Sequence, residues 1–308
     1  MMVKRLVLAS PRGFCAGVVR AVNVVELAVA KWGSPVYVRG EIVHNPHVVR
    51  SLQDKGVIFV NELDQVPEGA RVIFSAHGVD PAVRKSAEER GLKVIDATCP
   101  LVTKVHREAV KYAAEDYSIV LIGHEGHEEV VGTMGEAPGH IRLISSLEDI
   151  AGLEVENSGK VAYLTQTTLS VADTREMIGE LGKRFPSLEG PSAEDICYAT
   201  QNRQEAVREL AAEVGLILVV GAENSSNSQR LVEEARKHGV PAWLIGDVRA
   251  IRPEWLDGIE SVGLTSGASA PERLVDEVVA WFRQQGASVE QLVTCEEKVR
   301  FRLPSELR

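Results

Sequence analysis

The fold class follows from one short segment, Leu216-Ile217-Leu218-Val219-Val220-Gly221-Ala222-Glu223-Asn224-Ser225-Ser226-Asn227-Ser228. Its first five residues are apolar and rich in β-branched side chains, which is typical of a buried strand. Small polar residues follow at once, and a helical pattern covers residues 230–237. A strand, a polar junction and a helix in this order predict one βα unit of a parallel sheet.

The same order recurs along the whole chain. We expect strands at residues 6–9, 36–38, 72–75, 119–122, 161–164, 216–220, 242–245 and 262–264. We expect helices at residues 16–32, 101–114, 171–184, 201–214, 230–237 and 272–285. This alternation predicts an α/β fold, built from several smaller parallel-sheet units rather than from one large sheet.

Composition limits the kinds of partner. The 308 residues contain 34 Lys and Arg against 44 Asp and Glu, a net charge of −10, which argues against binding nucleic acid. No apolar run approaches the roughly 20 residues of a membrane helix. The apolar stretch after Lys4 and Arg5 is too short for a secretory signal. We therefore expect a cytoplasmic protein with neither nucleic-acid nor membrane partners.

The four cysteines are too few for a disulfide scaffold, and none forms a C-x-x-C pair. Cys15, Cys99 and Cys197 each stand at a strand-to-helix junction. Helix N-termini stabilise thiolates, and thiolates bind soft metals. One such cysteine is usually a small buried apolar residue, but three in equivalent positions favour a shared metal site. Cys295 precedes no helix, so we interpret it as structural or exposed.

Histidines and small polar residues gather at the same junctions. His44, His77, His124 and His127 lie there, whereas His47, His106, His140 and His238 are expected on helices or loop surfaces. The junction histidines could bind a metal or an anion. A set of hydroxyl and amide groups could join them in holding a small phosphate, or could cap helices instead: Thr167, Thr168, Ser225, Ser226, Asn227 and Ser269.

Glu129 follows His127 by two residues and is a candidate proton donor. The alternative is a solvated carboxylate in the first turn of a helix. Motifs of dinucleotide sites, of Walker-type phosphate loops and of serine-hydrolase elbows do not occur in the sequence.

Taken together, the junctions resemble those of the 4-hydroxy-3-methylbut-2-enyl diphosphate reductase family. Nine motifs occur in order: Pro-Arg-Gly-Phe-Cys-Ala-Gly (11–17), Val-His-Asn (43–45), Phe-Ser-Ala-His-Gly-Val (74–79), Asp-Ala-Thr-Cys-Pro-Leu-Val-Thr-Lys-Val-His (96–106), Gly-Thr-Met-Gly (132–135), Thr-Gln-Thr-Thr-Leu-Ser (165–170), Asp-Ile-Cys-Tyr-Ala-Thr (195–200), Asn-Ser-Ser-Asn-Ser (224–228) and Gly-Ala-Ser-Ala-Pro (267–271). An ordered set that spans the chain is far more specific than any one motif.

The resemblance implies one 4Fe–4S cluster held by Cys15, Cys99 and Cys197, with the fourth iron open to substrate. It also implies three similar α/β units packed around that cluster. We place them at residues 14–99, at 100–195, and at 196–285 joined by the N-terminal strand 1–13, followed by a C-terminal tail at 286–308.

The resemblance also assigns roles. The reaction would be a reductive dehydroxylation that gives isopentenyl and dimethylallyl diphosphates, with electrons from ferredoxin or flavodoxin. Glu129 would donate a proton, Thr167 would contact the hydroxyl region of the substrate, and His127 would assist. The diphosphate would be held by residues matching His44, His77, His127, Ser225, Ser226, Asn227 and Ser269, to which we add Thr168.

One departure from the family pattern is Glu128, which stands where proline is common and raises the question of which glutamate acts. Two other functions remain open from the residues alone. One is a Cys/His zinc hydrolase of a phosphorylated metabolite. The other is a non-catalytic iron–sulfur sensor, although no DNA-binding module is visible.

Overall fold

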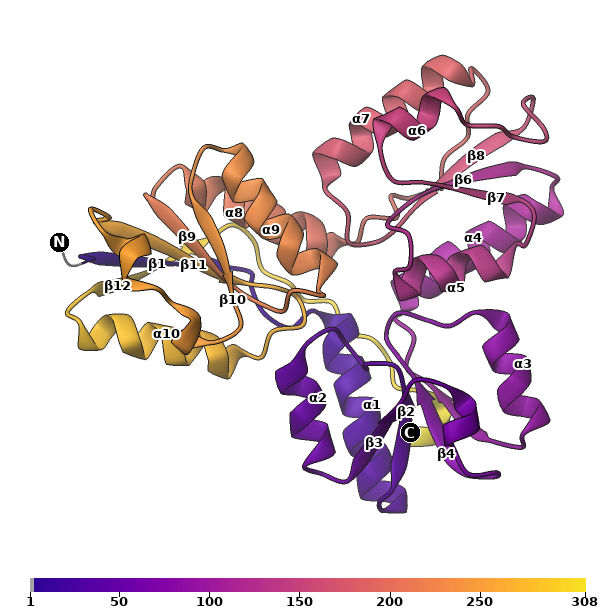
Figure 1. The fold of residues 1–308 in the computed structure, drawn as a ribbon, viewed down its shortest axis with the longest axis horizontal. Coiled ribbons are helices and arrows are strands. Elements are labelled where there is room, and N and C mark those ends of the chain that lie inside the picture. The colour runs from indigo at the N-terminus through magenta and orange to yellow at the C-terminus, as the bar shows by residue number, and fades with distance from the viewer. Residues whose placement is uncertain (1–2) are drawn as a thin grey trace. The chain divides into compact units, whose positions relative to one another are not determined.

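The structure is a computed structural model that describes residues 3–308 (Figure 1). Met1 and Met2 of the predicted N-terminal strand segment lie outside the described residues. The α/β fold class is confirmed, with three parallel sheets that we call A, B and C. The described residues divide into two compact units. Unit 1 contains the residues up to Val19, His44–Ser51 and Tyr198–Arg300, and unit 2 contains Arg20–Val43, Leu52–Cys197 and Phe301–Arg308.

Sheet A belongs to unit 1 and has the strand order β10-β9-β11-β1-β12. Its strands are β1 (Arg5–Ser10), β9 (Leu216–Val220), β10 (Ala242–Ile245), β11 (Ser261–Ser266) and β12 (Ser288–Val293). Its helices are α8 (Tyr198–Ala211), α9 (Ser226–Lys237) and α10 (Glu272–Gln284).

Strand β9 shows why this sheet is covered on both faces. All five of its residues are buried, and successive side chains point to opposite faces. Leu216, Leu218 and Val220 pack in the core that includes α10, whereas Ile217 and Val219 pack in the core that includes α8 and α9. A strand between two layers of helices must be apolar throughout, as the segment 216–220 is.

Sheets B and C belong to unit 2. Sheet B has the order β3-β2-β4-β5, with strands β2 (Val36–Arg39), β3 (Val57–Val60), β4 (Arg71–Phe74) and β5 (Lys93–Asp96). Sheet C has the order β7-β6-β8, with strands β6 (Ser118–Ile122), β7 (Ile141–Ile144) and β8 (Val161–Thr165).

The remaining helices are α1 (Ala16–Trp32), α2 (Pro46–Gln53), α3 (Pro81–Glu89), α4 (Pro100–Ala114), α5 (Glu128–Glu136), α6 (Leu147–Ala151) and α7 (Val171–Arg184). Short 3-10 helices lie at Leu63–Gln65, Val248–Ala250, Pro253–Leu256 and Ser305–Leu307.

The predicted elements agree closely with the observed ones, and helices α1 and α7 have the predicted bounds. Helix α9 begins at Ser226 rather than at residue 230, because Ser225 caps it by accepting a hydrogen bond from the Ser228 N–H. Helix α8 begins at Tyr198 rather than at residue 201. Ser288–Val293, in the segment expected as a tail, forms strand β12 beside β1. The predicted domain limits remain a prediction.

Within residues 3–308, every helix is too short or too polar to cross a membrane.

Candidate functional site

In unit 2, the candidate residues follow the carboxyl ends of three strands. Ser75–Gly78 come after β4, residues 123–127 come after β6, and residues 166–170 come after β8. The ends of parallel strands are where α/β proteins bind ligands.

Glu129 lies in the first turn of α5 and is only 3% exposed. Both of its carboxylate oxygens bind Thr167, whose backbone N–H donates to Oε1 (2.6 Å) and whose hydroxyl donates to Oε2 (2.9 Å). The alternative of a solvated surface carboxylate is therefore wrong, because this carboxylate is buried on a defined partner.

His127 caps the same helix. Its Nδ1 accepts a hydrogen bond from the Glu129 backbone N–H (3.2 Å), which satisfies one of the donors at the helix N-terminus. A ring nitrogen that accepts carries no proton, so a neutral His127 bears its proton on Nε2. The ring of His127 lies edge-on to that of His77, with centroids 6.0 Å apart.

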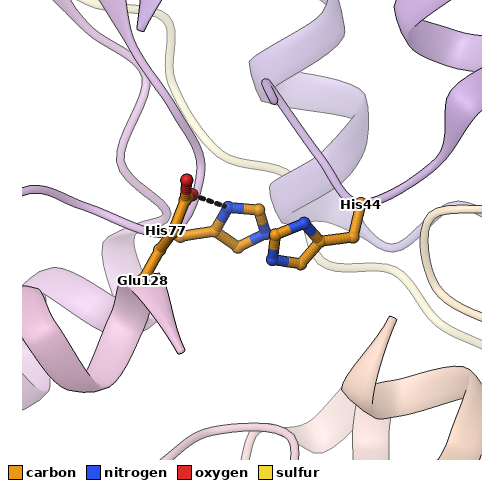
Figure 2. A group of neighbouring side chains, drawn as sticks. All are labelled: His44, His77 and Glu128. Carbon is orange, nitrogen blue, oxygen red and sulfur yellow. Dashed lines mark hydrogen bonds and ion pairs between the residues drawn. The ribbon is translucent and has the colours of Figure 1, made fainter. Parts of the chain in front are cut away.

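Glu128 has different partners from Glu129. Figure 2 shows its carboxylate beside His77, and the distance from Oε2 to the His77 Nδ1 is 3.0 Å. The Ser75 hydroxyl donates to the same oxygen at 3.5 Å, and its own oxygen accepts the His77 N–H at 3.3 Å. The Glu128 side chain is 34% exposed. The two adjacent glutamates are thus separated in both environment and contacts.

Two of the candidate cysteines belong to unit 2. Cys99 is the N-cap of α4, and its N–H donates to the carbonyl of Ala76, beside His77. Cys197 immediately precedes α8, and its N–H donates to the carbonyl of Thr167. Both cysteines are half-buried. Their backbones are therefore fixed to the junctions that carry the other candidate residues.

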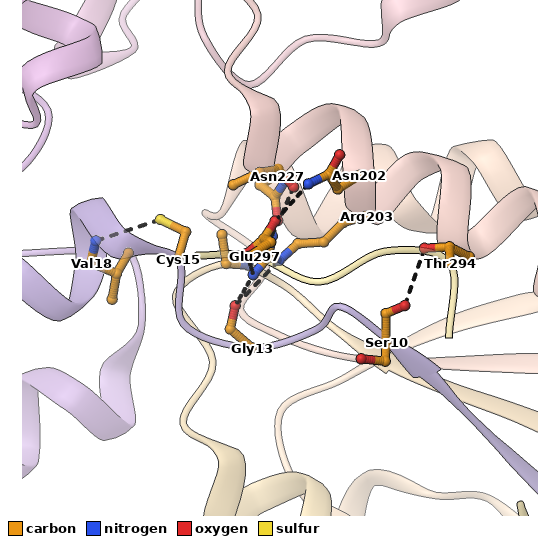
Figure 3. Close-up of polar contacts among 11 residues, drawn as sticks. Ser10, Gly13, Cys15, Val18, Asn202, Arg203, Asn227, Thr294 and Glu297 are labelled. Carbon is orange, nitrogen blue, oxygen red and sulfur yellow. Dashed lines mark hydrogen bonds and ion pairs between the residues drawn. The ribbon is translucent and has the colours of Figure 1, made fainter. Parts of the chain in front are cut away.

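Unit 1 holds the third cysteine. Cys15 immediately precedes α1, the Val18 N–H donates to its Sγ at 3.5 Å (Figure 3), and its own N–H donates to the Ala268 carbonyl. Asn227 accepts the Ala268 N–H on Oδ1 (2.8 Å), which ties the start of α9 to the same loop.

The other candidates of unit 1 are Ser269, His44, Ser225 and Ser226. The Ser269 hydroxyl donates to the His44 carbonyl at 3.0 Å. Ser225 and Ser226 are the N-cap and first residue of α9. Unit 1 thus places Cys15 and Ser269 on two neighbouring loops, and both Asn227 of α9 and the His44 carbonyl are hydrogen-bonded to the loop that carries Ser269.

Sequence reasoning assigned no role to Gln166, although it lies inside a quoted motif. Its side chain is 1% exposed, donates to the Thr168 hydroxyl (2.9 Å), and accepts the His124 N–H on Oε1 (3.0 Å). It therefore fixes Thr168 and directs His124 toward the β8 junction. The available signal was a polar residue immediately before the two candidate threonines, Thr167 and Thr168.

A charged group around Asp195 was also missed. Asp195 accepts from the Lys104 ammonium on Oδ1 (2.9 Å) and from the Thr165 N–H on Oδ2 (3.0 Å). Burial, with the hydrogen bond to Asp195, raises the pKa of Glu108 to about 7. These contacts connect α4, which follows Cys99, to the segment that leads to Cys197.

Asp96 lies three residues before Cys99. Burial alone would raise the pKa of its carboxyl, but hydrogen bonds from Thr98 and the charge of Arg84 outweigh burial and lower it. Asp96 is therefore ionised and holds the Thr98 N–H at 2.8 Å. This bond orders the turn that ends at Cys99.

The α/β fold carries half-buried thiols, imidazoles and a buried carboxylate in its loops and at its helix starts, a set of groups typical of an enzyme site. The profile of the LytB protein family matches residues 6–283. The chain is 55% identical to the 4-hydroxy-3-methylbut-2-enyl diphosphate reductase of Leifsonia xyli subsp. xyli, over 99% of this chain and 91% of that protein. It is 56% identical to the protein of the same name from Azotobacter vinelandii, over 98% of this chain and 97% of that protein.

A solved structure agrees. The E-1-hydroxy-2-methyl-but-2-enyl-4-diphosphate reductase from Plasmodium falciparum is 37% identical, with a TM-score of 0.96 over 99% of this chain and 97% of that one. The chain belongs to the LytB family and is an oxidoreductase. The resemblance in the nine motifs is confirmed.

Proposed function

We propose that this protein reduces 4-hydroxy-3-methylbut-2-enyl diphosphate to isopentenyl and dimethylallyl diphosphates, the last step of the methylerythritol phosphate route. The observation that carries the proposal is the buried Glu129 carboxylate bound to Thr167, in a chain 55% identical to reductases of that name. The reaction consumes two electrons and two protons and releases the hydroxyl oxygen as water.

We propose that Cys15, Cys99 and Cys197 hold one 4Fe–4S cluster. The donor set fits, because each of the three is a half-buried thiol that immediately precedes a helix of at least 14 residues. The positive end of a helix lowers the pKa of a thiol and favours the thiolate that iron requires. Cys295 follows β12 and precedes no helix, so it is not among the proposed ligands.

When bound, the cluster would supply single electrons and a Lewis-acidic iron that lacks a protein ligand. The chain itself must supply protons and hold the anion. We place the proton on Glu129, with Thr167 against the substrate hydroxyl. The Thr167 hydroxyl lies 2.9 Å from the Glu129 Oε2. A protonated Glu129 would donate across this contact to the Thr167 oxygen, and the Thr167 proton would then turn toward the substrate.

The proposed diphosphate-binding groups are donors. In unit 2, His77, His127 and Thr168 lie at strand junctions, and the proton of a neutral His127 is on Nε2 because Nδ1 accepts from Glu129. In unit 1, Ser225, Ser226 and Asn227 lie at the N-terminus of the 12-residue helix α9, joined by His44 and Ser269. A helix N-terminus attracts phosphate oxygens without any lysine or arginine, which suits an acidic chain.

The electron donor and the compartment are part of the proposal. Two one-electron deliveries suit a ferredoxin or a flavodoxin. All four cysteines are thiols, which suits the reducing cytoplasm.

The test is iron, acid-labile sulfide and zinc per chain on anaerobically purified protein, with Cys295→Ser compared against Cys99→Ser. We expect about four iron and four sulfide in the wild type and in Cys295→Ser, and loss of the cluster in Cys99→Ser. Turnover is then measured with the diphosphate substrate and a chemical reductant. About one zinc without sulfide would instead indicate the hydrolase, and a cluster without turnover would indicate the sensor.

A further inference from the structure

Arg203 of helix α8 is completely buried, with 0% of its surface exposed. Arginine is almost never buried in this way unless its charge is paired. Its guanidinium makes five hydrogen bonds (Figure 3). Two of them, from Nε (3.2 Å) and Nη2 (2.7 Å), go to the Gly13 carbonyl. The others go to the Ala199 carbonyl and to the Glu297 carboxylate.

Gly13 belongs to the loop that presents Cys15. It has a φ of +64°, a conformation that residues with a side chain rarely adopt, and its N–H donates to the Ser266 carbonyl. Two residues later, the Cys15 N–H donates to the Ala268 carbonyl. The loop is therefore held at three groups. The N–H groups of Gly13 and Cys15 donate to the end of β11 and to the loop that follows it, and the Gly13 carbonyl accepts from Arg203.

Glu297 provides the compensating charge. It lies in the segment that follows β12, its side chain is 15% exposed, and it also accepts from the Asn202 amide (3.1 Å). The same segment is fixed by Thr294, whose N–H and hydroxyl both donate to the Ser10 carbonyl. Residues 294–297 thus run beside the loop from Ser10 to Gly13 (Figure 3).

We propose that Arg203 and Glu297 are positioning residues for the cluster ligand Cys15. Arg203 fixes the loop through the Gly13 carbonyl, and Glu297 pairs with the buried guanidinium and holds its orientation. The segment after β12 is therefore part of the metal site, although it provides no ligand. This inference rests on the proposed function, because it takes Cys15 to be a ligand.

The experiment uses the reconstituted full-length holoprotein and compares three changes at this pair with one control. Arg203→Lys keeps the charge but cannot donate twice to the Gly13 carbonyl. Glu297→Gln keeps a hydrogen-bond acceptor without the charge. Arg203→Met combined with Glu297→Leu removes both charges, so no unpaired ion is left buried. The control is Arg208→Lys, on the same helix, where the guanidinium pairs with Glu205 and Glu234 instead.

The readouts are the rate of iron release to a chelator under anaerobic conditions, the electron paramagnetic resonance spectrum of the reduced cluster, and the unfolding midpoint of the apoprotein. We expect Arg203→Lys and the double variant to release iron about 10- to 100-fold faster, as is typical when the partners of metal ligands are lost. Their spectra should change, whereas Arg208→Lys should match the wild type. Glu297→Gln should give a smaller acceleration.

Wild-type release rates and spectra in Arg203→Lys and in the double variant would overturn the inference. The same would follow if Arg208→Lys released iron as fast as they do, because the effect would then be general destabilisation. Turnover is assayed on the same wild-type preparation. A wild type that holds the cluster without turning over substrate, beside variants that lose iron quickly, would support the inference while removing the proposed function.

Discussion

Thr167 binds both carboxylate oxygens of Glu129, one through its backbone and one through its side chain. The bond from the backbone fixes the carboxylate to the loop after β8, and the bond from the hydroxyl is the contact through which we propose that a proton passes. Glu128, one residue earlier, contacts His77 instead. The geometry thus distinguishes Glu129, the proposed proton donor, from Glu128, which contacts His77.

The first prediction concerns these two glutamates. Glu129→Gln should lower kcat by about 10²- to 10⁴-fold, the usual range for loss of a general acid, with the iron content unchanged. Glu128→Gln should mainly raise KM, because its carboxylate orients His77. Anaerobic steady-state kinetics on iron-matched samples would show this. Wild-type turnover by Glu129→Gln would remove this residue from the mechanism.

The second prediction concerns the Thr167 hydroxyl. Thr167→Val keeps the backbone bond to Glu129 but leaves Oε2 without that donor, which should cost about 1–3 kcal/mol of unfolding free energy. It should also lower kcat. Thr167→Ser restores the hydroxyl and should recover most of both. Urea unfolding and turnover test this, and equal behaviour of the valine and serine variants would contradict it.

The third prediction concerns Gly78, beside His77. Its φ is +81°, and an added Cβ would lie 2.9 Å from Cε1 of the buried His106. Gly91 is the matched control, since its φ is +61° and nothing lies within 4 Å of an added Cβ. Alanine at either position should cost about 1–2 kcal/mol for the left-handed backbone. Gly78→Ala should cost more and should raise KM, and equal unfolding midpoints would refute the crowding against His106.

The fourth prediction is a pH dependence of stability. Burial and the hydrogen bond to Asp195 raise the pKa of Glu108 from 4.5 to about 7, although Lys104 opposes the shift. The folded chain therefore binds this proton more tightly than the unfolded chain does. The resulting stability is complete below about pH 4.5 and is lost as the pH rises through about 7. The other titratable neighbour, Tyr112, stays neutral because burial raises its pKa to about 12.

Glu108→Gln replaces the titrating carboxyl with an amide, which binds no proton in this pH range. Its unfolding free energy relative to the wild type should therefore increase from about pH 5 to about pH 8. Urea unfolding of both proteins across this range measures the difference. A constant difference would show that Glu108 titrates normally.

The long elements could be predicted from the sequence. Residues 16–32 and 171–184 are helices with the expected bounds, since several turns of apolar periodicity define each one. Strands β5 and β7 are four residues long and contain charged side chains, so neither an apolar run nor a regular alternation of apolar and polar residues identifies them. Strand β12 is an edge strand with mostly exposed side chains, which is why it resembled a tail.

The sequence was enough to predict which residues belong to the candidate site, but not which of them contact one another. The thiols, histidines and hydroxyls were visible because most of them lie between a strand and a helix. The strand-to-helix junction expected at Cys197 is wrong, because α7 and a loop separate this residue from β8. The bond from Thr167 to Glu129 joins residues 38 apart, and the one from Arg203 to Glu297 joins residues 94 apart. Such contacts depend on how loops and helices pack, which no local pattern records.

Strand β1 lies between β11 and β12, with Arg5 opposite both Ser261 and Ser288. Sheets B and C, in contrast, are each built from one continuous part of the chain. During synthesis, β1 therefore cannot pair until β11 and β12 have been made, whereas sheets B and C can form as soon as their own strands have emerged. A chain truncated before Ser288 lacks both β12 and Glu297, so it cannot make the bond between Glu297 and Arg203 that we propose to position Cys15.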